Sequence, residues 1–304
     1  MRVLFTGISS FTGLWFARAL KAAGCDVVAP LRAITYDDPL RQARMAEAAK
    51  VADIVPAAPF GSQAFLDVLA GGFDVLCHHA AEAANHKSPD FDVAQAVAGN
   101  TFNAAATLAA ARAAGVQRLV LTGSVFEEGE GRGTLPLTAF SPYGLSKTLT
   151  ARAFQGECDR AGLPMVKFVV PNPFGPFEGQ TFQRAVMTRW SRGEAVHVSH
   201  PLYGRDNTPV DLLGHVYARA AGGTLGAHVS PSVYAGPVGA FFLRMARETR
   251  ARTGWACALS LADRQDSTEP LERYNLQPVE PADYGWSESA FWDAYAGYYG
   301  EGGR

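Results

Sequence analysis

Tyr143 and Lys147 have the side-chain types and the spacing needed for proton transfer. Ser141 is a favoured N-cap residue and Pro142 suits the first helical position, so the sequence predicts a helix with Tyr143 in its first turn. Residues four apart lie on one face of such a helix, where the ammonium group can act on the phenol. A nearby cation favours the phenolate and lowers the pKa of a tyrosine from its usual value of about 10. A phenol tuned in this way can exchange a proton with a substrate hydroxyl or carbonyl group.

The alternative explanation is a chance Y-x-x-x-K on a surface helix. The rest of the chain has to decide between this explanation and a catalytic pair. Gln117–Leu121 reads as a buried strand that delivers Thr122-Gly123-Ser124 at its carboxyl end. In a doubly wound sheet, ligands bind at that end. A hydroxyl group there can hold the reacting oxygen beside Tyr143. Without the tyrosine and the lysine, Ser124 would be interpreted as an ordinary turn serine.

The start of the chain predicts a dinucleotide site. Val3–Phe5 is a short apolar strand, and residues 14–23 have a helical pattern. The turn between them contains glycines, and the N–H groups at a helix start above such a turn bind a pyrophosphate. Ser10 stands where a middle glycine is usual, and its side chain either crowds the phosphates or donates a hydrogen bond to them. The residues expected to bind the cofactor here are Gly7, Ser9, Ser10, Phe11, Thr12 and Gly13.

The end of the second predicted strand bears on the choice between NAD and NADP. The segment Cys25–Arg32 ends without the carboxylate that binds an adenosine ribose and favours NAD. Arg32 can instead meet the 2′-phosphate of NADP, so the sequence leans toward NADP, with a merely solvated arginine as the alternative. Asp53 and Ile54 are expected to reach the adenine where the third strand, Val51–Val55, ends.

Phe73–Ala81 reads as a buried strand that ends in small residues, Ala80 and Ala81, against which a cofactor can lie flat. His78 and His79 suggest a metal site. Adjacent residues on a strand point to opposite faces, however, and no cysteine or carboxylate pattern completes such a site. We therefore assign the two histidines a structural role and predict no metal.

The composition is that of a globular protein without a preference for nucleic acid or membranes: 304 residues, a net charge of -2 and 48% hydrophobic residues. The apolar start is too short for a signal peptide, and no stretch approaches the ~20 apolar residues of a membrane span, so a cytoplasmic location is expected. The four cysteines show no C-x-x-C pairing and are expected to be reduced thiols: Cys25, Cys77, Cys158 and Cys257.

Alternating strands and helices predict an α/β fold, with a Rossmann-like doubly wound parallel sheet in residues 1–170 and a smaller substrate-binding domain in residues 171–304. Whether residues 206–233 return to the first sheet is left open. Pro171–Pro176 is expected to be a rigid turn that continues neither sheet nor helix, and the aromatic residues near the end are expected to form a core. Further helices are predicted over residues 43–52, 62–69, 91–114, 142–161, 183–192 and 238–249, and further strands over residues 164–170 and 195–198.

In combination, the motifs resemble the extended short-chain dehydrogenase/reductase family of nucleotide-sugar epimerases, dehydratases and reductases. The resemblance covers most of the first 215 residues. Thr6-Gly7 to Gly13 is similar to the family's T-G-x-x-G-x-x-G, His78-His79-Ala80-Ala81 to its H-x-A-A, and Tyr143 with Lys147 to its Y-x-x-x-K. Asn100 with Asn103 resembles the asparagine that the family has before its central helix. Asn172 with Gly175-Pro176 is similar to the family's N-x-x-G-P turn. Arg205-Asp206 with Val210-Asp211 is similar to its R-D-x-x-x-V-D motif, which touches the nucleotide diphosphate.

The resemblance implies a role for each matching residue. Tyr143 would donate or accept the proton, Lys147 would hold the nicotinamide ribose and tune the phenol, and Ser124 would bind the substrate oxygen. The segment that follows is about two residues shorter than in the family, so counting back from Val125-Phe126 selects Thr122, whereas strand register favours Ser124. The implied cofactor contacts add His78, Ala80, Ala81, Asn100, Tyr143, Lys147 and Pro171, and the implied substrate contacts are Ser124, Asn172, Arg205 and Asp206.

The resemblance implies hydride transfer between NAD or NADP and a nucleotide-diphosphate sugar. The lean toward NADP favours reduction of a keto-sugar with Tyr143 as proton donor. Epimerisation with a retained cofactor uses the same residues and is the first alternative. Gly123-Ser124 stands where dehydratases have an acid, so dehydration is not expected unless Glu127 or Glu128 substitutes.

Two other functions stay open. Reduction of a small carbonyl compound would leave Arg205 without a role. A non-catalytic dinucleotide sensor or scaffold belongs to a different class, and such proteins typically lose the tyrosine or the lysine that this chain keeps. The resemblance also implies a homodimer, formed through the helices that carry Asn103 and Tyr143.

Overall fold

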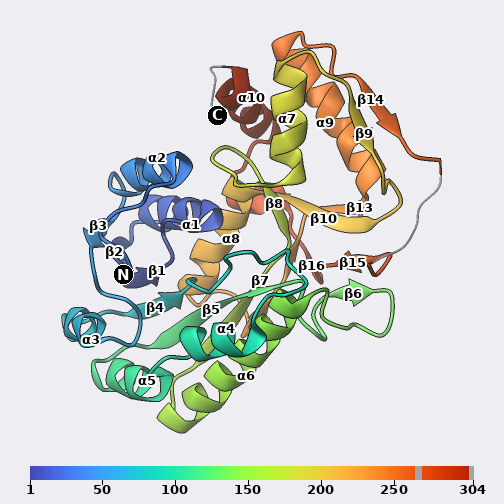
Figure 1. Ribbon diagram of the computed structural model, residues 1–304. Coiled ribbons are helices and arrows are strands. Elements are labelled where there is room, and N and C mark those ends of the chain that lie inside the picture. The colour runs from blue at the N-terminus through green and yellow to red at the C-terminus, as the bar shows by residue number, and fades with distance from the viewer. Residues whose placement is uncertain (264–268, 301–304) are drawn as a thin grey trace. The chain divides into compact units, whose positions relative to one another are not determined.

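Seven parallel strands form the largest sheet of the protein, in a computed structural model that describes residues 1–263 and 269–300 (Figure 1). The strands lie in the order β11-β7-β5-β4-β1-β2-β3. The chain builds one half of the sheet outward from β1 and then the other half outward from β4, so the strand order reverses between these two. The predicted doubly wound α/β fold is confirmed. The strands are β1 (Arg2–Thr6), β2 (Asp26–Pro30), β3 (Asp53–Val55), β4 (Val75–His78), β5 (Arg118–Ser124), β7 (Met165–Val170) and β11 (His228–Val229).

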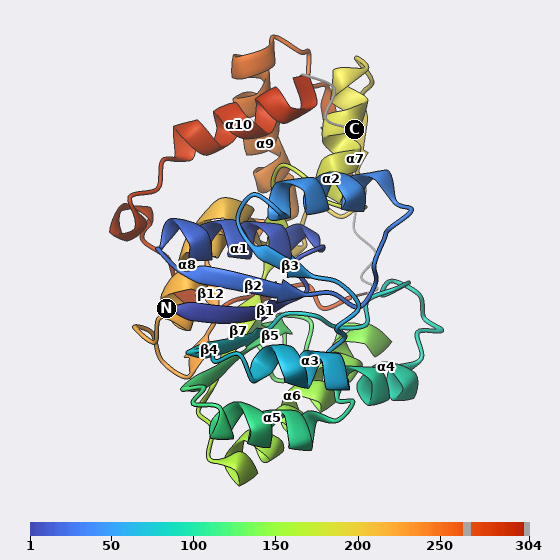
Figure 2. The same ribbon diagram turned by 90° about the vertical axis from the view of Figure 1, so that its left-hand side faces the viewer.

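Helices cover both faces of this sheet (Figure 2). On one face, α3 (Gln63–Leu69), α5 (Ala104–Ala113) and α6 (Pro142–Ala161) share a hydrophobic core with the strands. On the other face lie α1 (Phe11–Ala22) and α8 (Val210–Ala221), where Phe16 stacks on Tyr217 with ring centroids 4.1 Å apart. The remaining helices of this part are α2 (Pro39–Ala48) and α4 (Val93–Asn100).

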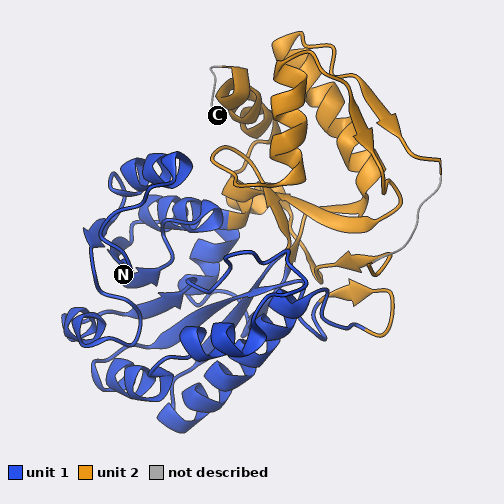
Figure 3. Ribbon diagram, viewed as in Figure 1, with its two compact units in different colours: residues 1–130, 137–170, 214–230 blue, residues 131–136, 171–213, 231–304 orange. Residues whose placement is uncertain are grey.

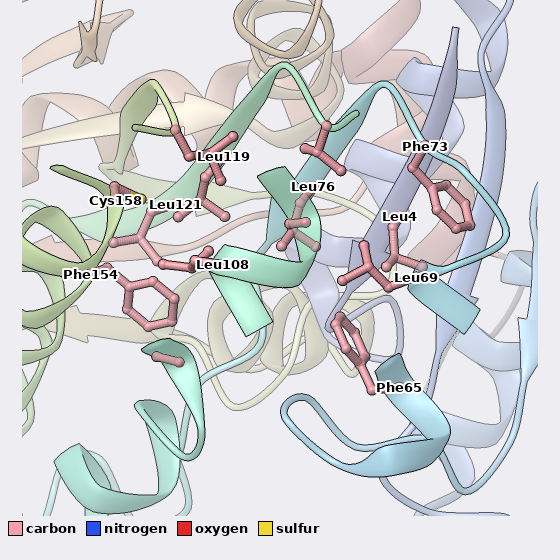
Figure 4. Close-up of a cluster of buried hydrophobic side chains, with 14 of the residues drawn as sticks. Leu4, Phe65, Leu69, Phe73, Leu76, Leu108, Leu119, Leu121, Phe154 and Cys158 are labelled. Atoms are coloured by element: carbon pink, nitrogen blue, oxygen red, sulfur yellow. The ribbon is translucent and has the colours of Figure 1, made fainter. Parts of the chain in front are cut away.

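The first core consists of apolar side chains from the central strands and from the helices on one face of the sheet (Figure 4). Leu4, Leu76 and Leu119 come from three neighbouring strands, and Phe65 and Phe154 come from helices α3 and α6. Each such fully buried side chain contributes roughly 1.5–3 kcal/mol of hydrophobic free energy. Because both faces of a parallel sheet are covered, its central strands are apolar throughout, as the runs in β1 and β4 show.

The chain divides into two compact units (Figure 3). The first comprises residues 1–130, 137–170 and 214–230, and the second residues 131–136, 171–213 and 231–304, of which 264–268 and 301–304 are outside the description. One of the breaks between the units lies between Val170 and Pro171. Of the segment left open, residues 214–230 belong to the large sheet's unit, which contains most of α8 together with β11.

The second unit consists of short strands and three longer helices. Its three-stranded sheet has the order β13-β10-β8. Its helices are α7 (Phe182–Ser191), α9 (Val238–Thr253) and α10 (Glu288–Gly300), with a 3₁₀ helix at Pro281–Tyr284. Its strands are β6 (Arg132–Gly133), β8 (Asn172–Phe174), β9 (Val196–Val198), β10 (Gly204–Pro209), β12 (Pro231–Ser232), β13 (Tyr234–Pro237), β14 (Leu259–Leu261), β15 (Arg273–Tyr274) and β16 (Gln277–Pro278).

Aromatic side chains fill the core of the second unit. Trp190 of α7, Phe242 of α9 and Trp292 of α10 are each at most 2% exposed and belong to one cluster with Phe174 and Tyr295. The expectation that the aromatic residues near the end of the chain form a core is confirmed for Phe291, Trp292, Tyr295 and Tyr299, all buried on α10.

Two sequence expectations about elements are wrong. The helix predicted over residues 91–114 is two helices, α4 and α5, because Asn103 adopts a left-handed conformation with φ of +52° between them. The turn predicted at residues 171–176 contains β8, which pairs in parallel with β10. The third predicted strand, residues 51–55, is the shorter β3, in which Asp53 lies opposite Val28 and Ile54 is the middle residue. The contact of Asp53 and Ile54 with an adenine stays a prediction.

No helix among the described residues is long and apolar enough to cross a membrane. All four cysteines are buried and unpaired.

Candidate active site

The helix that carries Tyr143 begins as the sequence predicts. Ser141 is the N-cap of α6, and its hydroxyl oxygen accepts a hydrogen bond from the Gly144 N–H at 3.3 Å. Tyr143 is therefore in the first turn, half-buried, with its ring at the edges of the rings of His86 and Phe91.

The pKa of Tyr143 shifts in the direction opposite to the expected one. Burial and, after it, the negative charge of Glu127 raise the pKa of the phenol to about 12. The expectation of a lowered pKa at Tyr143 is wrong for the protein without cofactor or substrate. Desolvation of the phenolate there outweighs any attraction by the Lys147 ammonium group. Lys147 is itself buried, and burial lowers the pKa of its ammonium group. Tyr143 is accordingly a protonated phenol at neutral pH.

Lys147 is held at the carboxyl end of β5. Its Nζ donates a hydrogen bond to the carbonyl oxygen of Thr122 at 2.6 Å. Thr122 lies two residues before the end of the strand, is 4% exposed, and its side chain faces Tyr217 of α8. Ser124 is the last residue of β5 and is more exposed. Of the two hydroxyl groups, that of Ser124 thus belongs to the more accessible residue.

Ser124 begins a tight turn. Its hydroxyl oxygen accepts a hydrogen bond from the Phe126 N–H at 3.2 Å, and its carbonyl oxygen accepts one from the Glu127 N–H at 3.1 Å. A hydroxyl group has one donor and two acceptor sites. The contact with Phe126 uses an acceptor site and orients the group, which leaves the hydroxyl proton for another partner.

This turn is bonded to α6. The Phe126 carbonyl oxygen accepts a hydrogen bond from the Phe140 N–H at 3.1 Å, and the Glu128 N–H donates to Thr148 Oγ1 at 2.9 Å. A Cβ atom on Gly144 would lie 2.3 Å from the Phe126 carbonyl oxygen, so only glycine lets the first turn of α6 approach so closely. The turn after β5 and the first turn of α6 are thus held against each other.

Two glycines shape the turn between β1 and α1. Gly7 has φ of +84°, and a Cβ atom there would lie 2.7 Å from the Ala80 backbone nitrogen at the end of β4. A Cβ atom on Gly13 would lie 2.1 Å from the Gly7 carbonyl oxygen. The start of α1 can therefore lie close over the strand ends only because both positions lack a side chain.

Ser10 uses its side chain inside this turn. Its hydroxyl contacts the Gly7 carbonyl oxygen at 2.9 Å, accepts a hydrogen bond from the Gly13 N–H at 3.0 Å and lies 3.0 Å from His79 Nε2. Thr12 Oγ1 lies 3.0 Å from the same ring nitrogen. Ser10 is the N-cap of α1. These contacts of the Ser10 hydroxyl lie within the turn and with His79, so they correspond neither to crowding the phosphates nor to donating a hydrogen bond to them.

The adjacent histidines lie on opposite faces of the sheet, as expected. His78 packs on Phe60, and His79 packs on Phe16 of α1. Burial lowers the pKa of both imidazoles to about 3, so both rings are neutral. In the described part of the chain, no group of three His, Cys, Asp or Glu side chains is arranged to hold a metal ion.

The ends of β1 and β4 fit a dinucleotide. The two strands are neighbours at the point where the strand order reverses, which is where this class of fold binds ligands. The first amide N–H groups of α1 have no preceding helical turn to bond, so they attract an anion. Gly7 and Gly13 form a cradle that any side chain would fill.

Two predicted cofactor contacts have other partners. Arg32 NH1 pairs with Glu82 Oε2 at 3.3 Å. Asn100 is buried; its side-chain oxygen accepts a hydrogen bond from the Glu82 N–H at 2.7 Å, and its amide donates to Thr150 Oγ1 at 3.2 Å. Asn100 therefore fixes the segment that follows β4 and connects it to α6.

The remaining predicted residues, Pro171, Asn172, Arg205 and Asp206, belong to the second unit. Arg205 is 6% exposed and stacks on Tyr203, and its NH2 pairs with Glu269 Oε2 at 2.9 Å. Asp206 Oδ1 accepts a hydrogen bond from the Val233 N–H at 2.9 Å. The guanidinium of Arg205 thus already has an anionic partner within its own unit.

Residues 3–215 match the model of a protein family described as the NAD dependent epimerase/dehydratase family. The chain belongs to this family. The resemblance to extended short-chain dehydrogenases/reductases is thereby confirmed, and the chain is an enzyme of the NAD-dependent epimerase/dehydratase family. A search of curated proteins found no match.

Solved structures of similar proteins support the fold. A UDP-glucuronic acid 4-epimerase from Bacillus cereus, in complex with UDP-glucuronic acid and NAD, has a TM-score of 0.75 at 16% identity, over 98% of both chains. The dTDP-glucose 4,6-dehydratase DesIV from Streptomyces venezuelae, with NAD bound, has a TM-score of 0.74 at 19% identity, over 99% of this chain and 98% of that one. A UDP-glucose 4-epimerase from Thermotoga maritima has a TM-score of 0.72 at 18% identity, over 100% of both chains. At these identities the likeness shows the fold.

Within the NAD-dependent epimerase/dehydratase family, this chain has a feature that the sequence analysis missed. The carboxylate of Glu127 lies under the Ser124 turn and accepts a hydrogen bond from the Ser124 N–H at 2.7 Å. The signal was present, because Ser124-Val125-Phe126-Glu127 is an S-x-x-E pattern, in which the acidic side chain reaches back to the backbone N–H of the serine. Its partner Lys167, on β7, gave no such signal.

Proposed function

We propose that the protein is an NAD(P)-dependent oxidoreductase that reduces a keto group of a nucleotide-diphosphate sugar, with Tyr143 as the proton donor. The observation that carries the proposal is that the turn after Ser124 is hydrogen-bonded to α6 and to the residues just before it, while Lys147 of α6 binds the Thr122 carbonyl oxygen at the end of β5. In the proposal, the Ser124 hydroxyl and the Tyr143 phenol meet the same substrate oxygen. The neighbouring strand ends, of β4 and β1, provide the dinucleotide cradle.

The protonation state of Tyr143 supports the direction of reduction. A phenol with a pKa of about 12 is protonated at neutral pH, and a protonated phenol can donate to a carbonyl oxygen as negative charge develops there. The Ser124 hydroxyl would donate a hydrogen bond to the same oxygen. The ammonium group of Lys147 would stabilise the phenolate that Tyr143 becomes.

The proposed cofactor site consists of backbone and small side chains of the first unit. A bound nicotinamide dinucleotide would supply the hydride. The N–H groups of Ser9, Phe11 and Thr12 and the cradle of Gly7 and Gly13 would hold its pyrophosphate. Ala80 and Ala81 would lie along it, with His78 below as a neutral ring and Asn100 fixing their segment.

The substrate class rests on Arg205 and on the family. Arginine suits a diphosphate because its planar group can bind two oxygens at once. Glu269, whose side chain is 49% exposed, is the partner that an incoming diphosphate would replace. Asn172 and Asp206 remain proposed substrate contacts of the second unit.

Epimerisation with a retained cofactor is the second candidate. The pairing of Arg32 with Glu82 favours it, because this pairing weakens the sequence argument for NADP and hence for a reductase. Two of the similar solved structures are 4-epimerases of UDP-sugars. In this reaction Tyr143 would take a proton from a sugar hydroxyl and later return it.

One assay tests both candidates. In the first step, a sample of the purified protein is denatured and any released nucleotide is identified. In the second step, folded protein is incubated with NADH or NADPH and one of three kinds of substrate: nucleotide-diphosphate sugars, their keto derivatives or free sugars. A reductase consumes reduced cofactor with the keto derivatives, whereas an epimerase interconverts sugars without net consumption. The Tyr143→Phe variant is expected to lose about 10²–10⁴-fold in kcat while remaining folded, because the lost hydroxyl is the proton donor. Turnover of free sugars alone, or full activity in this variant, would contradict the proposal.

A further inference from the structure

Four charged or titratable side chains lie in a row that begins under the Ser124 turn. Glu127 is fully buried; its Oε1 accepts the Ser124 N–H at 2.7 Å and its Oε2 pairs with Lys167 Nζ at 2.6 Å. The same ammonium group pairs with Glu130 Oε1 at 2.6 Å, and Glu130 Oε2 lies 2.9 Å from His228 Nε2. We call Glu127, Lys167, Glu130 and His228 the Glu127 network.

The network lies wholly within the first unit. Lys167 on β7 and His228 on β11 are direct cross-strand partners at the edge of the sheet. Side-chain exposure is 41% at His228, 10% at Glu130, 17% at Lys167 and 0% at Glu127. The network therefore extends from the accessible edge strand to the buried underside of the proposed catalytic turn.

Gly123 makes room for the network. A Cβ atom at this position would lie 2.8 Å from Glu127 Oε1 and 2.8 Å from Lys167 Cε. The residue before Ser124 therefore lacks a side chain where the carboxylate and the lysine stem pack against the strand. A buried carboxylate without a partner is strongly unfavourable, so the position of Glu127 depends on Lys167.

We propose that Glu127 is a positioning residue for Ser124, and that Lys167 holds Glu127 in place. The carboxylate binds the Ser124 N–H while the Glu127 N–H binds the Ser124 carbonyl oxygen, so both backbone groups of Ser124 are fixed by one residue. The hydroxyl is then directed by the backbone and by its contact with Phe126. The proposal rests on the role proposed above for Ser124 in the reaction.

The same geometry bears on dehydration. Both carboxylate oxygens of Glu127 are engaged, and the side chain is fully buried. It is therefore unsuited to protonate a leaving hydroxyl group, which is the role that the sequence left open for it.

The charge of Glu127 also acts on Tyr143. The titratable groups around the phenol are Lys147 on α6, Glu127 after β5 and His86 after β4, with Lys167 behind Glu127. Glu127 raises the pKa of Tyr143 and favours the charged form of Lys147. Neutralising Glu127 is therefore expected to move the pKa of Tyr143 downward, which a purely structural role of the residue would not do.

Hydrogen exchange tests the positioning without any substrate. In Glu127→Gln the Ser124 amide is expected to exchange about tenfold faster than in the wild type, because the amide loses a bond to a charged acceptor and the new NH₂ group opposes Lys167. The matched control is Glu128→Gln, whose exposed side chain lies one residue further on. Equal exchange in Glu127→Gln and the wild type would overturn the proposal.

Lysine variants cover the case in which Glu127→Gln does not fold. Lys167→Met is expected to speed exchange of the Ser124 amide, and Lys167→Arg, which keeps the charge, is expected to preserve its protection. Equal exchange in these two variants would likewise overturn the proposal.

Kinetics provide the second readout. With a turned-over substrate, Glu127→Gln is expected to lower kcat about tenfold with little change in KM, and to shift the pH limb of Tyr143 to lower pH, while Glu128→Gln does neither. A kcat unchanged in Glu127→Gln, or a loss that falls on KM and not on kcat, would overturn the proposal. If the wild type turns over no nucleotide sugar, the proposed function fails, and the exchange measurement still decides on Glu127.

Discussion

Ser10 illustrates how one substitution in a glycine-rich turn is accommodated at the scale of a residue. A serine at this position needs space and a partner. The turn offers both, because the hydroxyl caps α1 through the Gly13 N–H and lies 3.0 Å from Nε2 of the partly buried His79. His79 is neutral, so its Nε2 contacts two hydroxyl groups, those of Ser10 and Thr12, without placing a charge beside the turn. The serine therefore stabilises the turn from within: its own N–H and the Gly13 N–H are bonded inside the turn.

This interpretation predicts the effect of Ser10→Ala. Loss of the N-cap is expected to lower the free energy of unfolding by about 1 kcal/mol, and Ser10→Gly is expected to cost only a few tenths, since glycine is a tolerated N-cap. Urea denaturation measures both. Dinucleotide affinity is expected to change less than about threefold in either variant, because the hydroxyl is used within the turn. A large loss of affinity in Ser10→Ala alone would show that the hydroxyl contacts the phosphates after all.

At the scale of elements, the proposed site depends on how closely α6 approaches the turn after β5. Gly144 follows the proposed proton donor directly, and its missing side chain allows the contact with the Phe126 carbonyl oxygen. Thr148, one turn later, accepts from the Glu128 N–H. The approach of α6, which carries Tyr143, to the turn that begins at Ser124 thus depends on backbone packing.

Glycine-to-alanine substitutions on the same helix test this dependence. Gly144→Ala is expected to cost about 1–3 kcal/mol through overpacking and to lower kcat, because the new Cβ atom forces the two turns apart. Gly156→Ala is the matched control: a Cβ atom there meets nothing within 4 Å, so the variant is expected to gain up to about 1 kcal/mol from helix propensity with unchanged activity. Thermal unfolding and initial rates measure the pair. Equal behaviour of the two variants would contradict the role given to the close approach.

At the scale of the whole molecule, the second unit carries a buried acid that links the stability of the protein to pH. Glu178 is 1% exposed and accepts hydrogen bonds from Tyr295 at 2.6 Å, Tyr299 at 2.9 Å and Thr181 at 2.7 Å. Burial raises the pKa of this carboxyl group from 4.5 to about 7, against the opposing effect of the hydroxyl donors. The folded state therefore keeps a proton that the unfolded chain releases near pH 4.5.

A raised carboxyl pKa stabilises the folded state below the unfolded pKa, and this stabilisation is lost as pH rises through the folded value. The second unit is accordingly expected to lose on the order of 3 kcal/mol between about pH 4.5 and pH 7 through Glu178. Glu178→Gln, which cannot ionise, is expected to flatten this slope, whereas Glu280→Gln at an exposed position is expected to keep it. Calorimetric unfolding across this pH range measures all three proteins. An unchanged slope in Glu178→Gln would rule out this origin.

The sequence alone was sufficient for the features that depend on local pattern. Ser141-Pro142 marked the start of α6, and the observed helix Pro142–Ala161 ends where predicted, because capping residues and proline act within one turn of the chain. The βα alternation and the glycine turn predicted the sheet and its cradle for the same reason. Opposite orientation of His78 and His79 followed from the period of a strand.

The tertiary structure decided what depends on residues distant in the chain. β8 was missed because residues 172–174 become a strand only by pairing with β10. The pKa of Tyr143 went up because burial by other segments outweighed the lysine one turn away. Glu127 finds its partner Lys167 on a strand forty residues later. Spacing reveals which side chains can meet along one element, whereas burial and charge pairing across elements arise only when the strands are placed side by side.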